Sequence, residues 1–529
     1  MKRIIIAFIA LASSAVLAQS EQQSIELPDF VITGRQSINV PIAAKKKPDF
    51  IPTLSQDFFT PQFAPEDLPL FISSAPDPVT PNLNLTDNRN SSKLSIQLGK
   101  YSFPVGELQF SQSFENFLAN AKIWGSNIKE YIPNAGYNNS GVSLMNDFFI
   151  STRSDFLPGS VIKLGGDYIR DSYKFFGSAV PTDLRETNRA SGLFSISSSY
   201  SRWVSIGAGF SGNILSLNEN GFKETNFAVS GLFEFKLNSF SLGTKVYYTR
   251  QLLQKNLSMV DNYNYFAMNG YVRLFSAGSF NLIGGINVAS AGSQSFFSPF
   301  GSIEYRLVQG LTLGAEFNPH TKFFKVTDFL SQNLYFNPGL TDNVFLEYKT
   351  DFNAMIRYEY EKLFSVSLTG GYASMNNNYY FDDVITPGKL DLYILPKSDK
   401  LSGTISFFFY PTRLGYLIGD LNLSNVKDEA GNFIPYEPKS TLNLTYGYNF
   451  DFGIDFKIRY KMAQDIYTNI TNTYKLDNYN NMSVSLGYEI LSGLKLTADF
   501  QNVFNRTNFM WKLYREKPFD LLLGIEYHW

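Results

Sequence analysis

The chain has no cysteine, only two histidines among 529 residues, and no long apolar run beyond its first 17 residues. Without cysteine there is no disulfide framework, no thiolate metal site and no thiol to carry a lipid anchor. A transmembrane helix needs about 20 consecutive apolar residues, and no internal stretch approaches that length. Membrane lipases and proteases need a histidine base beside a nucleophile or an activated water, so two histidines leave little room for an enzyme.

The chain also lacks an excess of charge of either sign. Its 45 Lys and Arg residues face 47 Asp and Glu residues. Removal of Lys2 and Arg3 with a leader peptide would leave 43 basic residues and a net charge of −4. A nucleic-acid partner would require a basic surface, so none is expected.

Aromatic residues are abundant instead, at 16% of the chain, with 49 Phe and 32 Tyr. Near the C-terminus apolar and polar residues alternate, as in Met482 to Ile490 and Leu494 to Gln501. From Phe519 to Trp529 every odd position is apolar, and Leu522 alone breaks the polar series at the even ones. Because successive side chains of a strand point to opposite faces, one face suits lipid and the other water. This repeated pattern predicts an all-β, transmembrane antiparallel β-barrel.

The N-terminus predicts secretion. Lys2 and Arg3 precede the apolar run Ile4 to Leu17, and Val16-Leu17-Ala18 suits a cleavage site, so residues 1–18 read as a signal peptide. The alternative, a retained membrane anchor, is disfavoured because the run is short and contains Ser13 and Ser14.

Residues 19–92 differ in composition from the rest of the chain. Ten of the 23 prolines lie between Pro28 and Pro81, and no alternation is visible. Proline cannot donate to a regular hydrogen-bond ladder, so this sequence predicts an extended or disordered periplasmic segment. A simple spacer is the alternative interpretation.

From Lys93 to Trp529 the breaks between strands fall into two length classes, short turns and longer connections rich in Asn and Tyr. Barrels of bacterial outer membranes place short turns in the periplasm and long loops outside. Counting hairpins gives about 22 strands, with both chain ends periplasmic. The parity requires a short external loop at Phe103-Pro104-Val105. The expected short turns lie near 157–159, 201–202, 237–238, 277–278, 309–310, 362, 412–413, 450–451 and 492–493, and the expected long loops at 171–188, 251–262, 321–342, 376–397, 425–437, 463–479 and 504–518.

Two motifs in the second half of this barrel carry a family resemblance. Asn502-Val503-Phe504-Asn505-Arg506, followed by Leu523 to Trp529, is similar to the last two strands of the TonB-dependent outer-membrane receptor family. Phe317-Asn318-Pro319 through Asn337-Pro338-Gly339-Leu340 resembles its mid-barrel loop, although Thr341-Asp342-Asn343 replaces the usual Pro-Glu.

Leu27 to Arg35 is similar to the extended element around the TonB box of such receptors. The resemblance implies TonB or another periplasmic protein as a partner, bound by addition of a strand. Receptors of this family carry a plug domain of well over a hundred residues, whereas only 74 residues separate the signal peptide from the barrel. We therefore expect a receptor-like barrel without a plug. The residues expected to bind the periplasmic partner are Asp29, Phe30, Val31, Ile32, Thr33 and Gly34.

Aromatic residues among asparagines in the external loops are candidates for contact with a sugar or peptide ligand, although loops and membrane rims use the same residues for other reasons. His320 is expected at the surface of an external loop, His528 in the lumen at the periplasmic rim, and Asp382-Asp383 in solvent. No catalytic residue, metal site or cofactor is predicted. The ligand candidates are Tyr379, Tyr380, Phe381, Tyr467 and Tyr474, and the terminal aromatics expected to signal barrel assembly are Tyr527 and Trp529.

Lumen-facing charges of both signs, such as Asp455, Lys457, Arg459 and Lys495, predict a hydrated interior rather than a strongly ion-selective pore. The sequence thus favours an outer-membrane, receptor-like barrel that acts in transport or in an envelope assembly. Its partners would be outer-membrane lipid, the barrel-assembly machinery and a periplasmic protein. Two alternatives stay open: a passive, wide porin, and a docking or structural protein that transports nothing.

Overall fold

This computed structural model describes residues 92–529 apart from positions 200, 202, 220, 238, 256–258, 276–279, 340, 362 and 411–413. The predicted signal peptide, the Pro-rich segment up to residue 91 and the TonB-box-like element at 27–35 lie outside the described residues.

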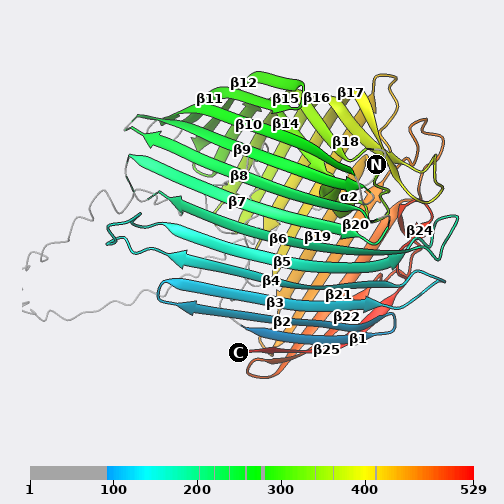
Figure 1. Cartoon of the computed structure of the whole chain (residues 1–529). Coiled ribbons are helices and arrows are strands. Elements are labelled where there is room, and N and C mark those ends of the chain that lie inside the picture. The colour runs from blue at the N-terminus through cyan, green and yellow to red at the C-terminus, as the bar shows by residue number, and fades with distance from the viewer. Residues whose placement is uncertain are drawn as a thin grey trace, which may run out of the picture. The chain divides into compact units, whose positions relative to one another are not determined.

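Antiparallel strands follow one another around a closed barrel (Figure 1). Each of the early strands pairs with the next along the chain. The first twelve strands are β1 (Lys93–Gly99), β2 (Ser102–Phe114), β3 (Phe117–Ile128), β4 (Tyr137–Phe149), β5 (Val161–Lys174), β6 (Leu184–Ser198), β7 (Val204–Leu217), β8 (Lys223–Lys236), β9 (Phe240–Lys255), β10 (Met259–Phe275), β11 (Phe280–Ala291) and β12 (Gln294–Val308).

The second half contains the longest strands and one helix. Its elements are β13 (Leu311–Phe317), β14 (His320–Lys325), α2 (Val326–Gln332), β15 (Asn343–Tyr360), β16 (Phe364–Asp382), β17 (Asp391–Phe409), β18 (Tyr416–Asp428), β19 (Ser440–Asn449), β20 (Ile454–Gln464), β21 (Tyr479–Leu491), β22 (Leu494–Gln501), β23 (Phe509–Trp511), β24 (Tyr514–Arg515) and β25 (Asp520–His528).

The barrel closes where β1 pairs with β25, with Leu94 opposite Tyr527. β13 and β14 pair with successive parts of β15 and so count as one position in the ring, while β23 and β24 form a separate hairpin. The wall therefore has 22 strands, which confirms the predicted fold class and strand number. No helix among the described residues is long and apolar enough to cross a membrane.

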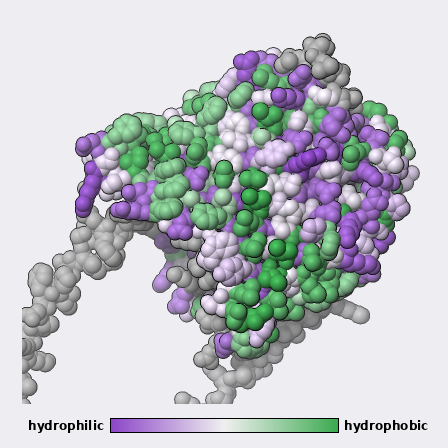
Figure 2. All heavy atoms as spheres, turned by 60° about the horizontal axis from the view of Figure 1, so that its bottom comes forward, coloured by the Kyte–Doolittle hydropathy of each residue, from purple (hydrophilic) through white to green (hydrophobic). Residues whose placement is uncertain are grey.

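The predicted lipid-facing register agrees with the exposure of the side chains. Leu486, Tyr488 and Ile490 on β21 and Leu523 and Ile525 on β25 are all exposed. Figure 2 shows hydrophobic residues over the strands in the middle of this face and hydrophilic residues gathered toward one end. Apolar side chains exposed on the outside of a closed sheet are suited to lipid.

Toward the short-turn end, charged side chains face the lumen and pair with one another. Lys93 and Lys122 lie 3.0 Å and 2.9 Å from the carboxylate oxygens of Glu107, and Lys495 pairs with Asp455. Charges on strands one or two positions apart thus balance each other, as the alternation of the sequence indicated.

The two ends of the barrel differ in their connections. One, called here the short-turn end, carries Ser92, Trp529 and turns such as Gln309-Gly310 and Ser492-Gly493. The other, the long-loop end, carries α2, the β23–β24 hairpin and the longer connections, as Figure 1 shows.

Two details of the predicted boundaries are wrong. Phe103-Pro104-Val105 lies inside β2, and the chain turns earlier, at Lys100-Tyr101. Several expected long loops are largely strand, because β9, β10, β16 and β17 continue past the apolar belt and pair beyond it. Tyrosine favours strands, and beyond the belt both faces of a strand meet water, so loss of the apolar alternation did not mark the end of the strand.

Candidate functional site

A segment of the wall leaves the barrel and folds inward at the long-loop end. After β13 the chain turns away from the wall at Asn318 and Pro319. Asn287 of β11 holds this turn, because its side-chain amide donates to Asn318 Oδ1 at 2.9 Å and to the Pro319 carbonyl at 2.7 Å. The pairing of β13 with β12 ends at Gly301 opposite Phe317, and β14 then pairs with β15 alone. We call β14, α2 and the loop up to Asp342 the lid.

β14 lies against the inner face of the wall. Tyr265, which points into the lumen from β10, stacks on Phe323 with ring centroids 5.5 Å apart, and its hydroxyl lies 2.9 Å from Thr321 Oγ1. His320 on the same strand is 6% exposed and stacks on Tyr348 at 4.3 Å. The predicted surface position of His320 is therefore wrong, because β14 is a buried strand rather than part of an outer loop.

The wall binds the first turn of α2 through Glu224, a residue of β8 with no exposed surface. Its carboxylate accepts hydrogen bonds from the backbone amides of Val326 at 3.0 Å and Thr327 at 2.9 Å, and from the Thr327 hydroxyl. Gln251 of β9 donates to the same carboxylate at 2.5 Å and to the Asp342 carbonyl at 3.1 Å. A negative charge at these free amides stabilises the start of a helix.

Arg185 of β6 holds the far end of the lid and is also completely buried. Its guanidinium donates to the carbonyls of Leu334 at 3.2 Å and Phe336 at 2.6 Å, and pairs with Glu219 at 2.5 Å. A buried guanidinium needs this full set of acceptors, so the loop after α2 is fixed by a charge that belongs to the wall.

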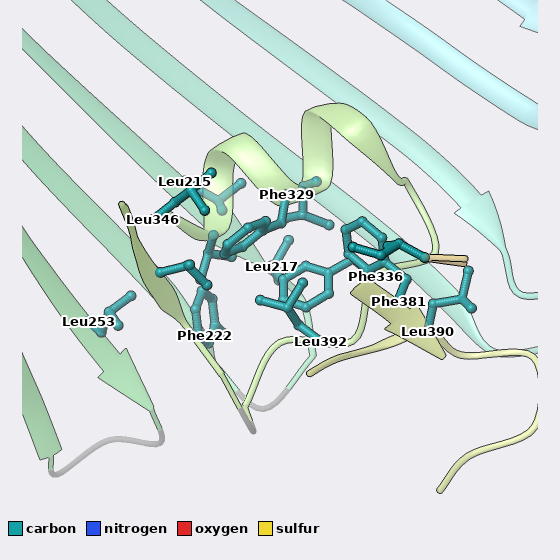
Figure 3. Packing of buried hydrophobic residues seen from close by; sticks show 14 of the residues in the cluster. Leu215, Leu217, Phe222, Leu253, Phe329, Phe336, Leu346, Phe381, Leu390 and Leu392 are labelled. Atoms are coloured by element: carbon teal, nitrogen blue, oxygen red, sulfur yellow. The ribbon is translucent and has the colours of Figure 1, made fainter. Parts of the chain in front are cut away.

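An apolar cluster fills the space between the lid and two parts of the wall (Figure 3). Phe329 points from α2 into this cluster, and Phe336 of the following loop lies 5.5 Å from it, centroid to centroid. β7 and β18, which both contribute residues, are ten strands apart in the ring of 22, close to the largest possible separation. The cluster therefore spans the mouth of the barrel. Its buried members are Leu215, Leu217, Phe222, Leu253, Val326, Phe329, Leu330, Phe336, Val344, Leu346, Met375, Phe381, Leu390, Leu392, Val426 and Ile434.

A second contact joins the lid to the β22–β25 connection. Tyr335 stacks on Tyr514 with centroids 3.4 Å apart, and Phe176 from the β5–β6 loop meets Tyr514 edge-on at 5.0 Å. Lys512, in the β23–β24 turn, pairs with Asp383 at 3.1 Å. Asp383 is thus buried in an ion pair and not free in solvent as the sequence suggested.

Between these elements lies a cavity of about 560 Å³, which we call the aromatic cavity. Two of its lining residues, Asn481 and Arg515, each have a buried side-chain atom, Oδ1 and Nε respectively, without a hydrogen-bond partner. Burial raises the pKa of Tyr131 to about 12 and raises the pKa of Glu516 above its usual value. Flat rings with amide and charged groups at their edges suit an organic solute. The lining includes Tyr131, Tyr137, Tyr173, Phe176, Tyr335, Trp511, Tyr514, Lys174, Gln332, Asn481, Gln501, Asn502, Arg515, Glu516 and Lys517.

The structure does not bring the five predicted ligand-contact residues together in loops. Tyr379, Tyr380 and Phe381 lie on β16, where Phe381 is 5% exposed and belongs to the apolar cluster. Tyr379 donates to Gln332 of α2 at 2.8 Å. Tyr467 stacks on Phe433 at 5.6 Å, and Tyr474 is 65% exposed. None of the five lines the aromatic cavity.

The terminal aromatics Tyr527 and Trp529 are exposed at the short-turn end and stack at 5.7 Å. His528 lies 2.7 Å from Glu526 on the lumen side. The predicted partner-binding residues Asp29 to Gly34 lie outside the described residues.

Sequence reasoning missed Arg185, Glu224, Tyr335 and Tyr514. The only available signals were a charged residue, in the expected loop 171–188 for Arg185 and near a strand end for Glu224, and a tyrosine in each of the expected loops 321–342 and 504–518. Many barrel positions share such residues.

The barrel is similar to solved structures of outer-membrane receptors and transporters. The chain matches the ferric-catecholate import receptor Fiu from E. coli with 11% identity, a TM-score of 0.63 and 83% and 82% of the two chains covered. It matches the iron transporter FrpB from Neisseria meningitidis with 11% identity, a TM-score of 0.64 and 83% and 81% covered, and the copper transporter OprC with 11%, 0.63 and 83% and 80%. The barrel therefore has the fold of the TonB-dependent receptors. Neither a protein-family model nor any curated protein sequence matches the chain.

Proposed function

We propose that this chain is an outer-membrane transport barrel whose long-loop end faces outward and is closed by its own lid. The observation that carries this proposal is the apolar cluster that joins α2 to β7–β9 and β15–β18 across the mouth. A barrel of 22 strands has a lumen too wide for its wall side chains to fill, so passage depends on what closes it.

The aromatic cavity is the proposed point of solute entry. It lies between the lid and the wall, and the tyrosine, amide and charged side chains of its lining provide hydrogen-bond donors and acceptors for a bound organic molecule. Movement of the lid would open the cavity and the mouth together, because Gln332 and Tyr335 are residues of the lid that also line the cavity. Transport barrels of the similar fold are named for iron, copper and siderophores, and the substrate proposed here is a small organic molecule or an organic chelate.

The energising partner is proposed from the sequence. Residues 1–18 would be removed on secretion, residues 19–92 would extend into the periplasm, and Asp29 to Gly34 would add a strand to TonB or another periplasmic protein. In this proposal the lid takes the closing role that a plug has in the receptor family. The C-terminal aromatics Tyr527 and Trp529 would direct barrel assembly.

Conductance of the purified full-length chain in planar bilayers tests the gating proposal. Phe329→Asp places a charge in the apolar cluster and should open the mouth, so a large stable current is expected where the wild type shows little. Ser331→Asp, which adds the same charge to the exposed side of the same helix, is the matched control and should stay closed. A wild-type current as large as that of Phe329→Asp would favour the passive porin and reject the lid. If the Phe329→Asp variant folds correctly but shows no current, the result would favour the docking or structural protein.

A further inference from the structure

A pocket of about 520 Å³ lies on the barrel wall, and its lining includes no residue of the lid or of the aromatic cavity. It forms where β14 leaves the wall, so that among the described residues β12 is paired with a strand on only one side from Gln294 to Phe300. We call it the β12 pocket. It is lined by Val288, Ala289 and Ser290 of β11, Ser295, Phe296, Phe297 and Ser298 of β12, and Lys349 of β15.

The free edge of β12 is not suited to another strand. Pro299 removes an amide donor from this stretch, and the Ser298 hydroxyl donates to the Pro299 carbonyl at 3.1 Å. Proline on an edge strand is a common protection against strand addition. The occupant of the pocket is therefore not expected to be a peptide in β conformation.

The pocket lies at the border of the apolar belt. On β12 the outward-facing residues run from Leu307 through Tyr305 and Ile303 to Phe297. Ten residues of a strand tilted by about 40° rise about 25 Å, which is the height of the belt on an outer-membrane barrel. Phe297, with 68% of its surface exposed, thus stands at the level of the lipid head groups.

The lining has an apolar part and a cationic part. Phe297 and Val288 provide the apolar part. Lys349 lies beside Phe296, with its ammonium 5.8 Å from the ring centre, and pairs with Glu347 at 2.9 Å. About half of the Lys349 side chain is exposed, so its ammonium can still donate toward the pocket.

We propose that the β12 pocket binds an amphiphile of the surrounding leaflet, with an acyl chain on Phe297 and a phosphate-bearing head group at Lys349. A gap in the wall at head-group level, with free backbone groups on its edge, matches a ligand that is apolar below and polar above. The proposal is independent of what the lumen transports.

Native mass spectrometry of the full-length barrel in neutral detergent tests this site. The probes are phosphatidic acid, diacylglycerol with the same chains, and glycerol phosphate without chains. We expect one tightly held phosphatidic acid, with diacylglycerol and glycerol phosphate each bound at least about tenfold more weakly. Equal retention of diacylglycerol would overturn the head-group contact, and equal retention of glycerol phosphate would overturn the acyl contact.

Variants locate the site. Lys349→Gln and Phe297→Ser should each weaken phosphatidic acid binding about tenfold. The controls are Lys223→Gln, an exposed lysine at the start of β8, and Phe210→Ser, a lipid-facing residue of β7 that is 50% exposed. Heat-modifiable migration on gels checks that all four variants fold. Equal binding by the pocket variants and the controls would mean that only ordinary annular lipid is present and would reject the proposal.

Discussion

Glu224 on the barrel wall and Thr327 on the lid are joined by two hydrogen bonds, one from the backbone amide at 2.9 Å and one from the side-chain hydroxyl. The two residues are 103 positions apart in the chain, and Glu224 has no exposed surface. A wall carboxylate therefore determines where the lid helix begins.

Glu224→Ala should loosen the lid and leave the barrel folded. The loss leaves the amides of Val326 and Thr327 buried without acceptors, at a cost of about 2 to 4 kcal/mol in the local stability of the lid. Hydrogen exchange of the α2 amides measures the effect, and Glu429→Ala on an exposed loop is the control. Unchanged exchange in α2 would show that the apolar cluster alone holds the helix.

Arg185→Ala should have an effect of similar or greater size at the other end of the lid. It leaves the Phe336 carbonyl and the Glu219 carboxylate without the guanidinium, while the Leu334 carbonyl keeps only the Tyr173 hydroxyl, for a loss of about 3 to 5 kcal/mol. Arg170→Ala removes a half-exposed pair with Glu186 and should cost less than about 1 kcal/mol. Limited proteolysis measures the effect: the 334–342 loop should be cleaved faster in Arg185→Ala than in Arg170→Ala. Equal cleavage rates would contradict the anchoring role of Arg185.

Leu486→Arg should impair assembly far more than Ser485→Arg. Leu486 is exposed on the lipid face of β21, where an arginine near the midplane costs about 2 to 4 kcal/mol. Ser485 faces the hydrated lumen opposite Asp499, which can pair with an introduced arginine. Equal yields of heat-modifiable barrel from outer membranes would refute the register.

The β24–β25 connection should become more stable as the pH falls. Burial raises the pKa of Glu516 above 4.5, so the folded loop favours the protonated carboxyl. The stabilisation from this group is fully present below its unfolded pKa and is lost as the pH rises through its raised pKa in the folded loop. Fluorescence of the nearby Trp511 during loop unfolding reports the change. Glu516→Gln should remove this pH dependence, and a variant as pH-dependent as the wild type would assign it to another group.

Ile32→Pro should abolish partner capture by the N-terminal segment without affecting the barrel. Proline removes an amide donor in the middle of an added strand and fixes φ. The measurement is crosslinking from position 31 in intact cells, with a folding assay in parallel. If the wild type captures no periplasmic protein, or the variant captures the same one equally well, residues 27–35 serve only as a tether.

The sequence by itself determined the barrel. Alternation such as Leu494 to Gln501 encodes which face meets lipid, and the Gly, Asn and Asp residues of the short turns mark where strands reverse. Each of these signals depends on residues a few positions apart, because a strand side chain alternates between lipid and water whatever lies elsewhere in the chain. The strand number followed from counting such reversals.

Only the tertiary structure decided how the barrel is closed. Arg185 and Phe336 are 151 positions apart, and Tyr514 and Gly388, joined by a hydrogen bond from the tyrosine hydroxyl, are 126 apart. The sequence around each residue resembles that of many other strand ends and loops, so nothing local predicts the pairing. His320 illustrates this, because it is buried only after β14 folds onto the inner face of β10. Local alternation determines the wall, whereas the lid depends on contacts that exist only when distant strands are brought around one ring.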